Sequence, residues 1–321
     1  METTRRNFLG TVGVATTAMA ASRAAKSVTP PSGPRLYVAA VTPCDRSLKF
    51  DDGIYRDLMP FFKERGADGV LVLGTTGEFA SFSVAERKRI AETALKHRSG
   101  LEIMVQVGTP NLPETLDLLA HAQANGADQV LCIPPFYFKK PSTAGLTKYY
   151  SQVLEAAKIP VNLYHYPGMS EVPITPELLH NLEKYPNLAG IKDSTGNADE
   201  YKGLLAQFPK LNMMTGTENN LPAALAAGKG AILVSANLFP RQASACFDAQ
   251  RKGGDVAAAY AKLREVNALS RVQGGGGAAA IKFGLTAYGF RESFVRPPQL
   301  DLTPEQKEQL KANLPKIKAL G

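Results

Sequence analysis

Eight short apolar segments alternate along this chain with longer stretches of helical spacing, and this alternation limits the possible folds more than any other feature. The segments are bounded by turn residues, as is typical of buried strands. They occupy residues 36–41, 69–73, 102–107, 129–133, 161–164, 188–191, 211–214 and 231–234. Strands separated by helices pair in parallel, and eight such units close into a barrel. The sequence therefore predicts an α/β protein with a TIM (β/α)8 barrel, which takes ~250 residues as one domain.

The stretches between the strands begin with residues that favour helix starts. Ser83 and Glu86 have the spacing of a capping box, in which two side chains satisfy otherwise unpaired backbone amides. Asn111 precedes Pro113, which places asparagine as the cap and proline in the first turn. Within 52–65, apolar residues recur at three- and four-residue steps. These patterns predict helices over 52–65 and 83–97, and a further helix that begins at Asn111.

The chain continues beyond the eighth strand with more helical spacing, near residues 255–270, 278–288 and 304–314. We expect the barrel to occupy 35–240, and 241–321 to form a C-terminal helical region packed on it. Residues 274–277 are four glycines between two of these helices. Since no Lys-Ser or Lys-Thr follows them, they indicate a flexible hinge or loop rather than a phosphate loop.

The first residues have the features of an export signal. Arg5 and Arg6 are followed by a short, moderately apolar segment and then by Ala18-Met19-Ala20. This order is typical of a twin-arginine signal peptide, which we assign to 1–26, with a linker rich in proline, serine and glycine at 27–34. The alternative is a frayed terminus with two chance arginines. The signal predicts a periplasmic or otherwise exported protein.

Composition excludes several classes of protein. With 44% hydrophobic and 21% charged residues, the chain is globular rather than disordered. It contains no run of ~18 apolar residues, so no stable membrane span is expected. The formal net charge of +8 is spread along the chain rather than clustered, which argues against a nucleic-acid partner. Three scattered cysteines and four histidines without ligand spacing predict no disulfide framework and no metal.

Reactive side chains are expected where the barrel strands end, because barrels of this type place their sites there. Lys192 follows the apolar strand 188–191, and desolvation at the barrel mouth favours the neutral amine that attacks a carbonyl. The alternative is a lysine paired with Asp193 on a solvated rim. Tyr164 ends the preceding strand and has a phenol that can donate and accept a proton, although an isolated tyrosine is more often a buried structural residue.

A turn follows the second strand and offers a place for an anion. Gly74, Thr75, Thr76 and Gly77 supply backbone amides and two hydroxyls, a combination suited to a carboxylate. His165 adjoins Tyr164, so strand alternation turns it away from the barrel interior, and we interpret it as structural.

Taken together, these segments resemble the dihydrodipicolinate synthase / N-acetylneuraminate lyase family of class I aldolases. The resemblance covers nearly the whole chain after the leader, and its most specific parts are 74–78 and 190–192 at the expected distance from Tyr164-x-x-Pro167. It implies that Lys192 forms a Schiff base with a 2-oxo acid, commonly pyruvate. It also implies that Tyr164 and Thr75 form the proton relay, that no metal or organic cofactor is needed, and that the chain is a homotetramer or homodimer.

The resemblance also implies a substrate pocket. Thr76 would bind the carboxylate, and the further positions that correspond to substrate contacts are Gly74, Gly77, Tyr137, Ser194, Gly216, Thr217, Glu218 and Ser235. For Glu218, a solvated loop carboxylate is the alternative interpretation.

Two departures from the family pattern bear on the substrate. Met169 stands where the synthases carry an arginine that grips the second substrate's carboxylate. Phe138 matches the tyrosine that a neighbouring subunit contributes to the relay, although Tyr137 would substitute for it if the loop shifts. Together with export, these departures argue against lysine biosynthesis.

The sequence therefore favours a Schiff-base lyase or aldolase that reversibly cleaves a 2-keto sugar acid to pyruvate and an aldehyde. The expected type is an N-acetylneuraminate lyase or a 2-keto-3-deoxy sugar-acid aldolase. Two alternatives stay open. One is 4-hydroxy-tetrahydrodipicolinate synthase, which joins pyruvate to aspartate semialdehyde. The other is a non-catalytic exported binding protein on the same barrel, for which the missing hydroxyl at Phe138 is the argument.

Overall fold

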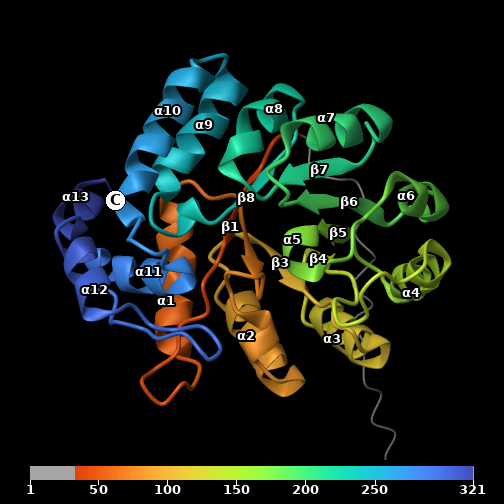
Figure 1. Cartoon of the computed structure of the whole chain (residues 1–321), viewed down its shortest axis with the longest axis horizontal. Helices are drawn as coiled ribbons and strands as arrows, with labels where there is room; N and C mark the ends of the chain where they lie inside the picture. The colour runs from red at the N-terminus through yellow and green to blue at the C-terminus, as the bar shows by residue number, and fades with distance from the viewer. Residues whose placement is uncertain (1–32, 321) are drawn as a thin grey trace, which may run out of the picture.

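The structure is a computed structural model that describes residues 33–320. Eight parallel strands form a closed barrel in sequence order, β1 to β8, surrounded by helices (Figure 1). This confirms the predicted TIM barrel. The expected signal peptide, 1–26, lies outside the described residues, as do residues 27–32 of the expected linker. The strands are Leu36–Ala39, Gly69–Val72, Glu102–Gln106, Gln129–Cys132, Val161–His165, Leu188–Asp193, Asn212–Thr215 and Ala231–Leu233.

Strand β6 differs from its prediction in a way that matters for the site. The apolar run ends at Ile191, yet the strand continues through Lys192 and Asp193. Both residues pair with β5 and β7, and both side chains are buried despite their polarity. The ladder therefore extends beyond the hydrophobic pattern and carries a lysine into the barrel mouth.

The helices follow the strands as the alternation predicts. Ser83 and Glu86 form the expected capping box at the start of α2, and the Asn111 side chain accepts from the Glu114 amide at the start of α3. The helices α1 to α8 are Asp52–Glu64, Val84–Lys96, Leu112–Ala124, Thr143–Ala156, Pro167–Ser170, Pro176–Leu182, Ala198–Gln207 and Leu221–Ala226. Helices α9 to α13 are Pro240–Lys252, Val256–Asn267, Gly277–Gly284, Pro304–Lys311 and Leu314–Ala319.

The last helices pack beside the first one (Figure 1). Phe61 on α1 contacts Tyr288 and Phe290 from the C-terminal region, with ring centroids 5.0 and 5.3 Å apart. The chain end thus covers the outer face of α1. Among residues 33–320, no helix is long and apolar enough to cross a membrane. The three cysteines are free and buried.

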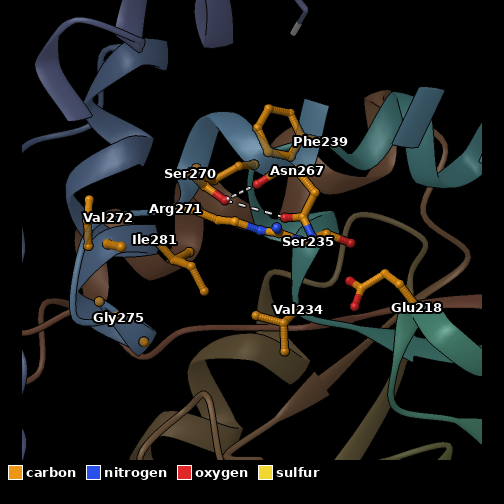
Figure 2. Close-up of a pocket in the computed structure, with 14 residues that line it drawn as sticks. Glu218, Val234, Ser235, Phe239, Asn267, Ser270, Arg271, Val272, Gly275 and Ile281 are labelled. Carbon is orange, nitrogen blue, oxygen red and sulfur yellow. Dashed lines mark hydrogen bonds between the residues drawn. The ribbon is translucent and has the colours of Figure 1, made fainter. Parts of the chain in front are cut away.

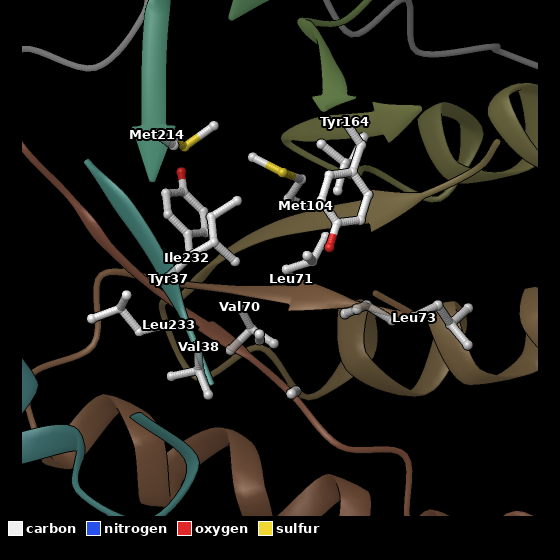
Figure 3. Packing of buried hydrophobic residues seen from close by; sticks show 14 of the residues in the cluster. Tyr37, Val38, Val70, Leu71, Leu73, Met104, Tyr164, Met214, Ile232 and Leu233 are labelled. Atoms are coloured by element: carbon white, nitrogen blue, oxygen red, sulfur yellow. The ribbon is translucent and has the colours of Figure 1, made fainter. Parts of the chain in front are cut away.

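The barrel interior is closed at its N-terminal end by a polar network. The Tyr37 phenol hydrogen-bonds to Glu102 and accepts from Gln129 Nε2 at 2.7 Å, and Asn162 Nδ2 donates to Gln129 Oε1 at 2.9 Å. Gly69 leaves room for Tyr37, because a Cβ there would lie 2.4 Å from its ring. Above this network, apolar side chains fill the interior (Figure 3), among them Leu71, Met104, Met214 and Ile232. Chemistry is therefore confined to the opposite end of the barrel.

Candidate active site

Lys192 and Tyr164 meet because they occupy paired positions on neighbouring strands. Strands β5 and β6 run parallel with Tyr164 opposite Lys192, so both side chains leave the sheet on the same face. Lys192 Nζ donates to the Tyr164 hydroxyl at 3.2 Å and lies 4.2 Å from the centroid of its ring. Lys192 is 4% exposed and Tyr164 is 1% exposed. The sheet register thus sets a buried amine against a phenol.

Thr75 extends this pair into a chain of three side chains. Its Oγ1 lies 3.2 Å from the Tyr164 hydroxyl. The turn that carries Thr75 is closed by a hydrogen bond from the Glu78 amide to the Thr75 carbonyl at 3.0 Å. The Thr42 hydroxyl donates to the Gly77 carbonyl at 2.8 Å and ties the turn to the end of β1. Lys192, Tyr164 and Thr75 therefore form a continuous hydrogen-bonded relay.

The surroundings of Tyr164 favour its ionised form. Burial by itself raises the pKa of the phenol, but the charge of Lys192 and hydrogen bonds with Thr75, Ser194 and Lys192 outweigh it. The pKa of Tyr164 is consequently lowered from its ordinary value. A phenol with a lowered pKa accepts and returns protons more readily near neutral pH. Tyr166 stacks on Tyr164 with ring centroids 5.8 Å apart and helps to fix its ring.

Gly216 and Ser194 lie directly against the lysine. A Cβ at Gly216 would lie 2.1 Å from Ser194 Oγ and 2.9 Å from Lys192 Cε. Only glycine lets the end of β7 approach so closely. Ser194 is 8% exposed, and its backbone amide donates to the His165 carbonyl at 2.9 Å. The structure thus brings both of these predicted substrate-binding positions to the lysine, with Ser194 in contact with the relay.

Asp193 does not pair with Lys192, so the solvated-rim alternative is wrong. The Asp193 carboxylate accepts from the Thr195 hydroxyl at 2.9 Å, and burial raises its pKa. His165 is structural, as expected. Its Nε2 lies 2.8 Å from Glu200 Oε1, and its Nδ1 accepts from the Ile174 amide at 3.0 Å.

Five further predicted positions form two groups. Half-buried Thr76 and buried Gly74 belong to the turn of Thr75, while Thr217, Glu218 and Ser235 follow strands β7 and β8. Glu218 and Ser235 line a pocket of about 410 Å³ (Figure 2).

The loop after β4 and helix α5 lies outside this cluster. Tyr137 is 74% exposed and its ring contacts Phe138, which is 60% exposed. Met169 is 57% exposed. The structure therefore leaves these three side chains exposed on the surface.

Sequence reasoning missed a buried ion pair beneath the turn. Lys282 Nζ lies 2.5 Å from Glu78 Oε1, and both side chains are fully buried. Lys282 also donates to the Phe294 carbonyl at 2.6 Å, and the Arg296 amide donates to Glu78 Oε2 at 2.8 Å. Glu78 directly follows the turn at 74–77, but nothing in the sequence pattern linked it to a helix 204 residues away.

Among residues 33–320, no three His, Cys, Asp or Glu side chains gather in a way that could hold a metal ion. The absence of a metal or cofactor in the reaction stays a prediction.

Comparison with known families decides the class of this barrel. The model of the dihydrodipicolinate synthetase family matches residues 33–317. The chain belongs to this family. Its members are lyases and synthases that use pyruvate through a Schiff base, so the protein is a class I aldolase or lyase in the broad sense.

The relatives of this dihydrodipicolinate synthetase family member carry different names. An uncharacterized DapA-like lyase of Chloroflexus aurantiacus is 38% identical over 265 residues, which cover 81% of this chain and 88% of the relative. A 4-hydroxy-tetrahydrodipicolinate synthase of Neisseria meningitidis is 31% identical over 280 residues, with coverage of 86% and 96%. The crystal structure of the E. coli K12 prophage protein YagE, in complex with pyruvate, superposes with a TM-score of 0.82 at 28% identity. It covers 89% of this chain and 98% of YagE.

Proposed function

We propose that this family member reversibly cleaves a 2-keto sugar acid to pyruvate and an aldehyde through a Schiff base on Lys192. The observation that carries the proposal is the buried Lys192 amine, 3.2 Å from a phenol that is itself 3.2 Å from Thr75. An amine held out of water next to a proton acceptor is what nucleophilic attack on a ketone requires. The pyruvate complex of the related YagE supports a 2-oxo acid as the bound half.

The first half of the proposed reaction builds the electron sink. Lys192 passes a proton to the Tyr164 phenolate, and the neutral amine attacks C2 of the keto acid. The carbinolamine that forms loses water, with the proton for the leaving hydroxyl supplied through Tyr164. The product is a protonated imine that withdraws electrons from C3.

The second half breaks the carbon–carbon bond. Tyr164 accepts the proton of the C4 hydroxyl, the C3–C4 electron pair moves into the imine, and the aldehyde leaves. The remaining enamine takes a proton at C3, and water hydrolyses the imine to release pyruvate and the free amine of Lys192. Thr75 exchanges protons with Tyr164, while Thr76 and the amides of its turn bind the carboxylate.

Two exposed side chains favour a sugar acid over aspartate semialdehyde as the second half. Met169 has a neutral thioether and cannot grip a second carboxylate by a charge-assisted hydrogen bond. Phe138 lacks the hydroxyl that a partner subunit would contribute. The names of the relatives support the second candidate, 4-hydroxy-tetrahydrodipicolinate synthase, as well as they support the first, because the Neisseria relative is such a synthase. Phe138 is also the feature that favours the third candidate, a binding protein without turnover.

Assembly and location complete the proposal. We propose a homodimer or homotetramer, as the family resemblance implies, and export by the twin-arginine pathway. Light scattering on the purified protein tests the first. Fractionation of cells that carry the full chain or its Arg5→Lys, Arg6→Lys variant tests the second, and equal export of both would contradict the signal.

The deciding experiment traps the Schiff base. The protein without residues 1–26 is incubated with pyruvate and borohydride, and the adduct is located by mass spectrometry. We expect one adduct on Lys192 that is lost in Lys192→Ala, with circular dichroism showing that the variant is folded. A folded wild-type protein without an adduct would overturn the proposal. Aldehyde screening then separates the first candidate from condensation with aspartate semialdehyde, and absence of any turnover leaves the binding protein.

A further inference from the structure

The pocket that Glu218 and Ser235 line is built from two parts of the chain that are far apart in sequence. Glu218 and Ser235 follow strands β7 and β8, while Arg271, Gly275, Gly276 and Gly277 come from the stretch between α10 and the start of α11 (Figure 2). Its volume is about 410 Å³. Gly216, two residues before Glu218, lies against Lys192 Cε. The segment after β7 therefore links Lys192 to the pocket, because it contacts the lysine at Gly216 and lines the pocket at Glu218.

Arg271 supplies a positive charge without a partner. Its guanidinium forms no ion pair or hydrogen bond with any of the residues 33–320, Glu218 included. In Figure 2 its side chain extends into the pocket and points toward Ser235. Arg271 is exposed, so its guanidinium is open to an incoming ligand, and a carboxylate or a phosphate matches its planar set of donors.

The start of α11 adds backbone donors to the same wall. Gly276 is the N-cap residue, and no side chain caps the helix. The first amides of a helix have no partner within it and carry the positive end of its dipole. Gly276, Gly277 and Ala280 line the pocket. Gly277 has a φ of 48°, so glycine suits its backbone, and its lack of a side chain leaves the amides uncovered.

Ser235 is an independent observation that points to a ligand. The residue is only 6% exposed, and its Oγ is buried without a hydrogen-bond partner among the described residues. A buried hydroxyl without a partner is unfavourable, so such groups are normally satisfied. Ser235 lines the pocket, and a ligand there would satisfy it.

We infer that this pocket binds an anionic group, a carboxylate or a phosphate, at the far end of the aldehyde half of the substrate. Arg271 and the first amides of α11 hold the anion. Ser235 and Glu218, on the side nearer the lysine, take hydroxyls between the anion and the reacting carbon. The inference rests on the proposed function and narrows its substrate class to keto acids with a second negative charge.

The experiment compares aldehydes that differ in charge and little else. Condensation with pyruvate is measured for succinic semialdehyde against butanal, and for glyceraldehyde 3-phosphate against glyceraldehyde. The variants are Arg271→Gln and Arg89→Gln. Arg89 is exposed on α2 and lines no part of the pocket, so its variant removes the same charge without touching the site. The two pairs distinguish a carboxylate from a phosphate.

For the wild type and Arg89→Gln we expect at least one charged aldehyde to be preferred over its neutral partner. Arg271→Gln should lower kcat/KM for that aldehyde roughly tenfold to a hundredfold, through KM, because a hydrogen bond to a charged group is lost. The neutral aldehyde should be unaffected. Equal losses for both, or none, would overturn the inference.

Failure of the inference is separable from failure of the proposed function. Trapping of pyruvate on Lys192 reports the proposed function alone and should be the same in Arg271→Gln. Binding of succinate and of glycerol 3-phosphate, measured by calorimetry, reports the pocket alone and needs no turnover. Binding that depends on Arg271 in a protein that traps no pyruvate would keep the anion site and refute the aldolase. Trapping of pyruvate in a protein that binds neither anion would keep the aldolase and refute the anion site.

Discussion

Two lysines are buried in this barrel, and their surroundings are opposite. Lys192 is 4% exposed, and its amine donates to the Tyr164 hydroxyl at 3.2 Å. Lys282 is fully buried, and its amine meets the Glu78 carboxylate at 2.5 Å and the Phe294 carbonyl at 2.6 Å. Within residues 33–320, no carboxylate lies at ion-pair distance from Lys192. The Lys282 amine is therefore paired with a carboxylate, whereas the Lys192 amine is not.

This difference separates a reactive lysine from a supporting one. The Lys192 amine contacts a phenol rather than a carboxylate, which fits the proposed role of a nucleophile that attacks a ketone. Lys282 pairs with Glu78, which follows the turn of Thr75 and Thr76. Glu78 also accepts from the Arg296 amide, so the C-terminal region braces the turn. We propose that Lys192 is the nucleophile and that Lys282 positions the residues that assist it.

The largest effect is expected from Lys192→Met. Loss of the nucleophile should lower turnover roughly ten-thousandfold or more. The free energy of unfolding should stay the same or rise, because an apolar side chain of similar size replaces an uncompensated polar one. Activity assays and urea denaturation measure the two quantities. Retained turnover would contradict the assignment, and a large loss of stability would show that Lys192 also has a supporting role.

Tyr164→Phe should have the next largest effect. It removes the proton acceptor at 3.2 Å from the amine and leaves the ring in place. We expect kcat to fall roughly a hundredfold to ten-thousandfold, as for loss of general acid–base catalysis. Borohydride trapping should be slower but still give an adduct on Lys192. Thr75→Val is the companion variant, with a smaller decrease expected, because Thr75 acts on the substrate through Tyr164.

The sequence predicted the fold and the position of Lys192 because both depend on local patterns. Strand periodicity and turn residues located eight strands, and the position of Lys192 after an apolar run placed it at the barrel mouth. Tyr164 followed from the same reasoning, since the ends of neighbouring parallel strands lie side by side. Their direct pairing in the register, Tyr164 opposite Lys192, is what the structure adds.

The buried ion pair and the pocket of Arg271 could not be predicted from the sequence, because both depend on contacts between distant segments. Glu78 and Lys282 are separated by 204 residues, and no sequence pattern around either residue indicates that the two side chains pair. Arg271 stands next to a glycine stretch that the sequence identified only as a hinge or loop. Its role becomes visible once the barrel brings that stretch to Ser235. Tertiary packing, rather than local spacing, creates both features.

Lys282→Met tests the supporting lysine with the same substitution. Removing one member of a buried ion pair leaves Glu78 charged and uncompensated, which costs about 3–5 kcal/mol of stability. Urea denaturation should show this loss, in contrast to Lys192→Met. Adding Glu78→Gln should recover part of it, because the double variant buries no charge at this position. Lys282→Met with wild-type stability would break the comparison.

The smallest effect concerns the pKa of the Tyr164 phenol. Burial raises that pKa, while the charge of Lys192 and hydrogen bonds with Thr75, Ser194 and Lys192 lower it below the ordinary value. In Lys192→Met the raising effect stays and the effect of the charge disappears, so ionisation of Tyr164 should move to higher pH. The absorbance of tyrosinate, titrated against pH and corrected with Tyr164→Phe, measures the shift. In the double variant Lys282→Met, Glu78→Gln the titration should match the wild type, because the ion pair that it removes carries no net charge. A shift of equal size in both variants would mean that the phenol responds to the overall charge of the barrel rather than to its neighbour on β6.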